Sequence, residues 1–134
     1  MKRSVLLLLA VTVALLLASG VAIARTFNCD GGLCRGTNSS DTVYGSSGRD
    51  NIYSLGGADL VRGNGDDGVN GGDADDLVAG NDGNDVLHAG NGDDRVEAAD
   101  GMEDFIFCGN GRHDIAVFDR GIDHLSECED ERPR

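Results

Sequence analysis

Large aromatic side chains and basic residues are scarce in this 134-residue sequence. It has no Trp, two Tyr and four Phe, so we do not expect a conventional core of interlocking large side chains. Eleven Lys and Arg stand against 24 Asp and Glu, which gives a formal net charge of −13. A strongly acidic surface repels nucleic acid and anionic membranes, so we exclude both as partners and expect cations instead.

Acidic residues are absent from residues 1–24, which we interpret as a secretory signal peptide. A positively charged start, an apolar stretch from Val5 to Ala18 and the small residues Ala22-Ile23-Ala24 match the three parts of such a signal. An uncleaved membrane anchor is the alternative, because the apolar character is long enough to span a bilayer. Ser19-Gly20 interrupts the run, however, and no basic cluster follows. We therefore expect cleavage after Ala24, secretion, and no membrane span in the mature chain.

The four cysteines are an even set in a chain that we expect to be exported, so disulfides are expected. Three connectivities are possible, and the spacing favours Cys29–Cys34 and Cys108–Cys128. A zinc site is the alternative, although the cysteines are split between the two ends and form no CxxC pair. Three histidines could add ligands to such a site: His88, His113 and His124.

The feature that dominates the rest of the chain is an Asp that returns at a nearly fixed interval. The series is Asp41, Asp50, Asp59, Asp67, Asp76, Asp85, Asp94, Asp104 and Asp114, with steps of 9, 9, 8, 9, 9, 9, 10 and 10 residues. An apolar residue follows two positions after each Asp, and a Gly-rich turn such as GNDGND (80–85) precedes it. Such self-similarity at a short period is typical of a solenoid.

Each unit combines a turn of about six residues with a strand of about three. Asn-Gly and Asp-Gly also indicate hairpins, so an antiparallel meander is the competing structure. The strands are too short for a meander to bury much, and the Gly placement repeats in every unit. We predict an all-β parallel β-roll (β-solenoid) of about nine nonapeptide repeats, two per coil. Aspartates of units n and n+2 then share a flank, which pairs Asp41 with Asp59 and Asp50 with Asp67.

The predicted organisation has four parts. After the signal peptide (1–24) come an N-terminal disulfide loop (25–35), the repeat roll (36–118), and a C-terminal cap with an acidic tail (119–134). The last two units are each one residue longer, as expected of a cap that protects an open sheet edge.

The turn chemistry favours a hard cation. Ca²⁺ takes six to eight oxygens from carboxylates and backbone carbonyls, and Gly allows the backbone to turn its carbonyls inward. Two stacked turns could enclose an ion. Because each unit has one apolar side chain to bury and the chain is strongly self-repelling, we expect the metal-free protein to be marginally stable or unfolded.

The runs GSSGRDNIY, GGDADDLVA, GNDGNDVLH and AGNGDDRVE resemble the calcium-binding nonapeptide repeat of RTX (repeats-in-toxin) proteins, G-G-x-G-x-D-x-U-x with U apolar. The resemblance covers Gly36 to about Ala116 and implies a β-roll with several Ca²⁺ ions held between successive turns. It assigns ligand roles to Asp41, Asp50, Asp59, Asp67, Asp76, Asp85, Asp94 and Asp104. The matching turn glycines are Gly45, Gly48, Gly57, Gly71, Gly80, Gly83 and Gly92. His113 is an extra residue in the pattern, so Asp114 stays outside this set.

We expect a secreted, calcium-binding structural or interaction module without catalytic activity. No nucleophile motif is present, and a uniform roll offers no obvious cleft for a catalytic carboxylate. We also expect no attached toxin, protease or lipase domain of the kind to which such repeats are usually joined. The alternatives are an accessory or residual module of an extracellular enzyme or toxin, and a cell-surface adhesin.

Overall fold

The computed structural model describes residues 23–134, so the predicted signal peptide lies outside the described residues except for Ile23 and Ala24. The described chain forms two sheets. The seven-stranded sheet contains β1 (Thr26–Asn28), β3 (Thr42–Tyr44), β5 (Leu60–Arg62), β7 (Leu77–Ala79), β9 (Arg95–Glu97), β11 (Ile115–Phe118) and β13 (Asp130–Pro133). The six-stranded sheet contains β2 (Gly32–Arg35), β4 (Asp50–Tyr53), β6 (Gly68–Asp73), β8 (Val86–Asn91), β10 (Phe105–Asn110) and β12 (His124–Ser126).

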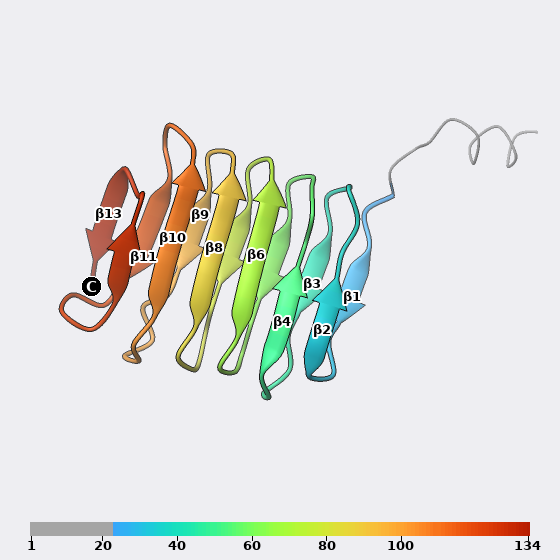
Figure 1. Cartoon of the computed structure of the whole chain (residues 1–134), viewed down its shortest axis with the longest axis horizontal. Helices are drawn as coiled ribbons and strands as arrows, with labels where there is room; N and C mark the ends of the chain where they lie inside the picture. The colour runs from blue at the N-terminus through green and yellow to red at the C-terminus, as the bar shows by residue number, and fades with distance from the viewer. Residues whose placement is uncertain (1–22) are drawn as a thin grey trace, which may run out of the picture.

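The two sheets are wound from one continuous solenoid. Successive strands alternate between the sheets, and each strand pairs in parallel with the strand two further along the chain, as Figure 1 shows. About six coils result, which confirms the predicted parallel β-solenoid. The antiparallel meander is wrong, because strands of three to six residues stack coil on coil rather than folding back as hairpins.

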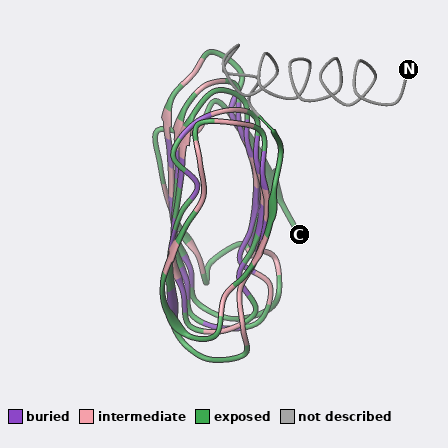
Figure 2. Ribbon diagram, turned by 90° about the vertical axis from the view of Figure 1, so that its right-hand side faces the viewer, coloured by how far each residue is buried: buried purple, intermediate pink, exposed green. Residues whose placement is uncertain are grey.

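The core is a narrow double column of apolar side chains between the sheets. The residue two positions after each Asp points inward, and the register stacks Val43, Val61, Val78 and Val96 in one sheet. Ile52, Val69, Leu87 and Ile106 stack in the same way in the other. Viewed along the solenoid in Figure 2, the buried residues line the inside of the two walls. The apolar residue two positions after each Asp therefore lies inside the coil, and in later repeats a second buried residue such as Ala89 or Ala98 joins it.

The solenoid extends beyond residues 36–118. The segment predicted as an N-terminal loop contains β1 and β2, and the segment predicted as a cap with an acidic tail contains β12 and β13. Phe27 and Leu125 supply apolar side chains that pack against the main core, which is why these flanking segments join the sheets. The last strand, β13, is exposed along its whole length.

Both disulfides lie at the ends of the roll. Cys29 is bonded to Cys34, with a Cα–Cα distance of 5.8 Å, and Cys108 to Cys128, with 5.1 Å. This is the connectivity that the spacing favours. All four thiols are consumed, so a zinc site built on cysteine is wrong. Residues 23–134 contain no helix with the length and apolar character that crossing a membrane requires.

Close stacking of the coils makes some glycines irreplaceable, and a pair of substitutions tests this. Gly90 has φ +123°, and a Cβ there would collide with the carbonyl oxygen of Gly72 in the neighbouring coil. Gly48 has no such φ, and a Cβ there would lie 3.6 Å from Ser46 Oγ. We expect Gly90→Ala to lower the free energy of unfolding by about 1–3 kcal/mol or more. Gly48→Ala should stay within about 0.5 kcal/mol of the parent.

Chemical denaturation of the oxidised protein at a fixed, saturating calcium concentration provides the measurement. Equal losses in the two variants would contradict the packing argument, because only one of the two sites lacks room for a methyl group.

Candidate metal site on the two aspartate ladders

The aspartates of the series occupy one structural position, at or immediately before the first residue of a strand. Side chains alternate along a strand, so an Asp and the apolar residue two positions later point to the same side. The repeat therefore directs its carboxylates into the interior together with its Val, Ile or Leu. All nine are buried, with exposed fractions between 0 and 4 %: Asp41, Asp50, Asp59, Asp67, Asp76, Asp85, Asp94, Asp104 and Asp114.

Hydrogen bonds link these aspartates into two ladders, one on each flank. The backbone N–H of each Asp up to Asp104 donates to Oδ1 of the Asp one coil further on, for example Asp59 N to Asp76 Oδ1 at 2.8 Å and Asp67 N to Asp85 Oδ1 at 2.8 Å. Asp114 N donates instead to Glu129 Oε2 at 3.1 Å. The first ladder runs through Asp41, Asp59, Asp76, Asp94 and Asp114. The second runs through Asp50, Asp67, Asp85, Asp104 and Asp123. The two columns match the predicted pairing of every second unit.

Two ladder members were not in the predicted ligand set. Asp114 is completely buried, because the coil accommodates the additional residue by placing His113 at the surface. Asp123 accepts hydrogen bonds from Asp104 N at 3.0 Å and from Asp119 N at 2.7 Å. The sequence does contain a signal for Asp123, since it follows Asp114 by nine residues and precedes the apolar Leu125 by two.

The second carboxylate oxygen of the interior aspartates has no partner. Oδ2 is buried without a hydrogen-bond donor in Asp59, Asp67, Asp76, Asp85, Asp94, Asp104 and Asp114. Buried polar atoms are nearly always paired, and an unpaired buried charge is costly. Each of these oxygens therefore requires either a proton or a cation.

The first turn on each flank is built differently. Oδ2 of Asp41 accepts from Thr37 N at 2.7 Å and from Thr37 Oγ1 at 2.8 Å. Oδ2 of Asp50 accepts from Ser46 N at 2.6 Å and from Ser46 Oγ at 2.9 Å. These two predicted ligands thus already have donors from their own turns, in contrast to the interior aspartates.

The predicted turn glycines fall into three groups. Gly71 and Gly80 lie against the unpaired oxygens: a Cβ on Gly71 would come within 2.7 Å of Asp76 Oδ2, and one on Gly80 would meet Asp85 Oδ2. A side chain there would fill the space in front of the carboxylate. Four others face the backbone of a neighbouring coil: Gly45, Gly57, Gly83 and Gly92. A Cβ on Gly48 would make only an ordinary contact with a side chain, 3.6 Å from Ser46 Oγ.

Burial changes the acidity of the ladder carboxyls. Desolvation raises the pKa of Asp76, Asp85 and Asp104 to about 7 and that of Asp59 and Asp94 to about 6. The hydrogen bond from the neighbouring ladder N–H lowers the pKa but does not cancel the effect, and repulsion between acidic groups adds to the increase. Desolvation by burial also raises the pKa values of Asp67 and Asp114. The metal-free interior thus favours protonated carboxyls.

Carboxylates alone do not form a complete coordination shell here. Nowhere in residues 23–134 do three His, Cys, Asp or Glu side chains come together as a metal-binding group. Ca²⁺ takes six to eight oxygens, and backbone carbonyls are among its usual ligands. The donor set therefore fits Ca²⁺ if the Gly-rich turns supply carbonyl oxygens beside each Oδ2.

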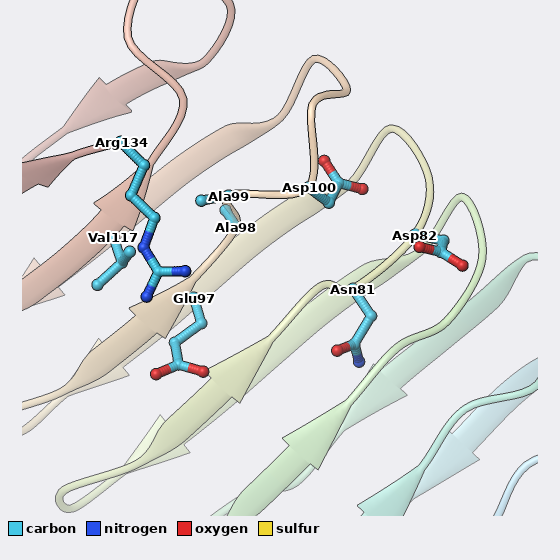
Figure 3. Close-up of a pocket in the computed structure, with 8 residues that line it drawn as sticks. All are labelled: Asn81, Asp82, Glu97, Ala98, Ala99, Asp100, Val117 and Arg134. Carbon is cyan, nitrogen blue, oxygen red and sulfur yellow. The ribbon is translucent and has the colours of Figure 1, made fainter.

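A separate shallow cavity of about 220 Å³ lies beside these turns (Figure 3). In this view Asp82 and Asp100 extend from neighbouring turns, while Glu97 and Arg134 lie at the other side of the group. The residues that line it include none of the ladder aspartates. The cavity is therefore distinct from the candidate metal site.

The raised pKa values predict how the stability of the metal-free roll depends on pH. The pKa of Asp76 rises from 3.8 to about 7 on folding, so the folded state holds protons that the unfolded state has already lost. Stability should be greatest below about pH 4 and should fall as the pH rises through about 7. Thermal unfolding of protein freed of metal by dialysis measures this, and Asp76→Asn combined with Asp85→Asn should flatten the profile. A metal-free roll that gains stability between pH 4 and pH 8 would contradict the assignment.

Comparisons with known proteins identify the repeat. Neither the curated proteins nor the solved structures include a significant match to this chain. A family model described as the RTX calcium-binding nonapeptide repeat matches residues 35–69 and 70–101, which together make up half of the chain. The matched residues contain the interior coils and most of both ladders. The chain therefore belongs to the RTX calcium-binding nonapeptide repeat family.

Proposed function

We propose that this protein is a secreted, non-catalytic module that binds several Ca²⁺ ions along its two aspartate ladders and depends on them for its fold. The observation that carries the proposal is the repeated, buried and unpaired Oδ2 of seven aspartates. Family membership supports the choice of metal, because these repeats typically bind Ca²⁺.

The ligand roles fall on the interior of each ladder. Asp59, Asp76, Asp94 and Asp114 would serve the first flank, and Asp67, Asp85 and Asp104 the second. Their Oδ1 atoms are engaged in the ladder, so Oδ2 is the atom left for a cation. A bound ion supplies the positive charge that the buried carboxylates lack, and it replaces the protons that the metal-free interior retains.

A structural or interaction role is favoured over catalysis by the uniformity of the ladders. A catalytic carboxylate is distinguished from its neighbours by its pKa and its place in a cleft. Here raised pKa values occur in coil after coil, and the cavity beside the turns contains none of these groups. This repetition favours a structural or interaction role in which all coils take part.

Secretion is supported by the disulfides and by the signal-like N-terminus. Outside the cell, Ca²⁺ sites with dissociation constants of about 10⁻⁴–10⁻³ M are sufficient for occupancy. Calcium at the destination would then complete the fold only after export.

A calcium titration tests the proposal directly. Far-ultraviolet circular dichroism of the mature, oxidised protein should change from a weakly structured to a β-rich spectrum as Ca²⁺ is added at pH 7.5. Chelator should reverse the change, because ions that bind only the assembled roll stabilise it by mass action. A spectrum that is the same in millimolar Ca²⁺ and in excess chelator would contradict the proposal.

A matched pair of variants locates the ions. Asp76→Asn retains an oxygen that can accept the ladder hydrogen bond from Asp59 N, but it replaces the unpaired oxygen by an NH₂ group and removes the charge. Asp82→Asn removes the same charge from an exposed turn position. Isothermal titration should show fewer bound ions, or binding at least about tenfold weaker, for Asp76→Asn only. Equal binding by both variants would remove the ladder from the site.

A further inference from the structure

The N-terminal end of the first ladder is closed by a residue that is not an aspartate. Thr26 is in register with Thr42, so Arg25 occupies the position before β1 that an aspartate occupies before β3, β5, β7, β9 and β11. The backbone nitrogen of Arg25 donates to Oδ1 of Asp41 at 2.9 Å. This is the bond that Asp41 N makes to Asp59 Oδ1 one coil further on. Arg25 N is thus the terminal donor of the ladder.

The same nitrogen lies at the expected cleavage site. We propose that proteolytic processing after Ala24 makes Arg25 the mature N-terminus, and that its free α-amino group forms an ion pair with the buried carboxylate of Asp41. The start of the mature chain would then coincide with the first position of the ladder. Processing would create the terminal cap as well as release the signal peptide.

The chemistry of processing changes this donor without moving it. Hydrolysis of the Ala24–Arg25 peptide bond adds one water, leaving a carboxylate on Ala24 and an amino group on Arg25 that takes up a proton. An amide nitrogen offers one hydrogen and no net charge. The ammonium offers three hydrogens and a positive charge at the same place, and charge-assisted hydrogen bonds are about twice as strong as neutral ones.

Asp41 is suited to receive that charge. Its side chain is only 3 % exposed, and its Oδ2 is already bound by the backbone and hydroxyl donors of Thr37. All of its protein donors are therefore neutral before processing. Within residues 23–134 no basic side chain forms an ion pair with it. The α-ammonium would be the cation that compensates this carboxylate.

The second flank provides an internal comparison. The residue that aligns with Asp50 is Gly32, whose backbone nitrogen donates to Arg49 O rather than to the carboxylate. Oδ1 of Asp50 accordingly has no donor. Closure by a backbone nitrogen is therefore specific to the flank on which the mature chain is expected to begin.

Four oxidised proteins test the ion pair: a chain that starts at Arg25, a chain that retains residues 22–24, and the Asp41→Asn variant of each. The longer chain keeps the Arg25 amide donor, so the comparison isolates the charge. At saturating calcium, retention of residues 22–24 should lower the thermal midpoint by about 2–8 °C when Asp41 is present and by no more than about 1 °C when Asn replaces it. Asp30→Asn, which removes an exposed acid near the same end, should leave the full difference intact.

Two results would overturn the inference. One is a midpoint difference between the long and short chains that persists in Asp41→Asn, because the extra residues would then act sterically rather than through charge. The other is an equal midpoint for the two chains with Asp41 in place. Mass spectrometry of the exported protein provides an independent test. We expect an N-terminus at Arg25, and a different first residue would exclude the ion pair between its α-amino group and Asp41. Repeating the comparison at several calcium concentrations separates the ion pair from calcium binding, since the ion pair predicts the same order of stability at each concentration.

Discussion

A single group, the buried carboxylate of the repeat aspartate, sets both the geometry and the chemistry of this protein. One oxygen accepts a backbone hydrogen bond from the adjacent coil and so links the coils in the register of the paired strands. That arrangement leaves the other oxygen inside the protein without a donor. The geometry that stacks the coils therefore also leaves a buried oxygen that a proton or a cation must compensate. The same side chain thus provides the acceptor of the ladder hydrogen bond and the unpaired buried oxygen.

The apolar column, the disulfides and the first turns are arranged around these buried carboxylates. The apolar column contains one or two residues per repeat and stacks continuously from Val43 to Val96 and from Ile52 to Ile106, but it is too thin to resemble the core of a conventional domain. The disulfides are placed where the ladders end rather than where they are densest. Thr37 and Ser46 donate to Oδ2 of the first aspartate on each flank, so these two oxygens have neutral donors from their own turns. The same oxygen of the interior aspartates has no such donor.

The period of the sequence predicted most of the fold. Asp and the apolar residue two positions later point to the same side of a strand, so their fixed spacing indicates which side chains lie in the interior. The parallel sheets and the two columns of aspartates follow from that spacing. The ends were harder to predict. Asp123 was hidden within a charged segment, although its nine-residue spacing and Leu125 mark another repeat. The sequence leaves the register of Asp114 open, because the position of an added residue depends on the path of the backbone, which places His113 at the surface. The hydroxyl bonds of Thr37 and Ser46 depend on side-chain conformation, which periodicity does not encode.

The C-terminal disulfide has a consequence for the assembly of the roll. Stacked repeats interact with their neighbours only, so the first coil to close has nothing to rest on and is the difficult one. Cys108 and Cys128 are 20 residues apart, a span of about one coil, whereas Cys29 and Cys34 enclose only a short loop. The Cys108–Cys128 bond also closes this span in the unfolded chain, which reduces the entropy that the chain loses when β10 and β12 pair.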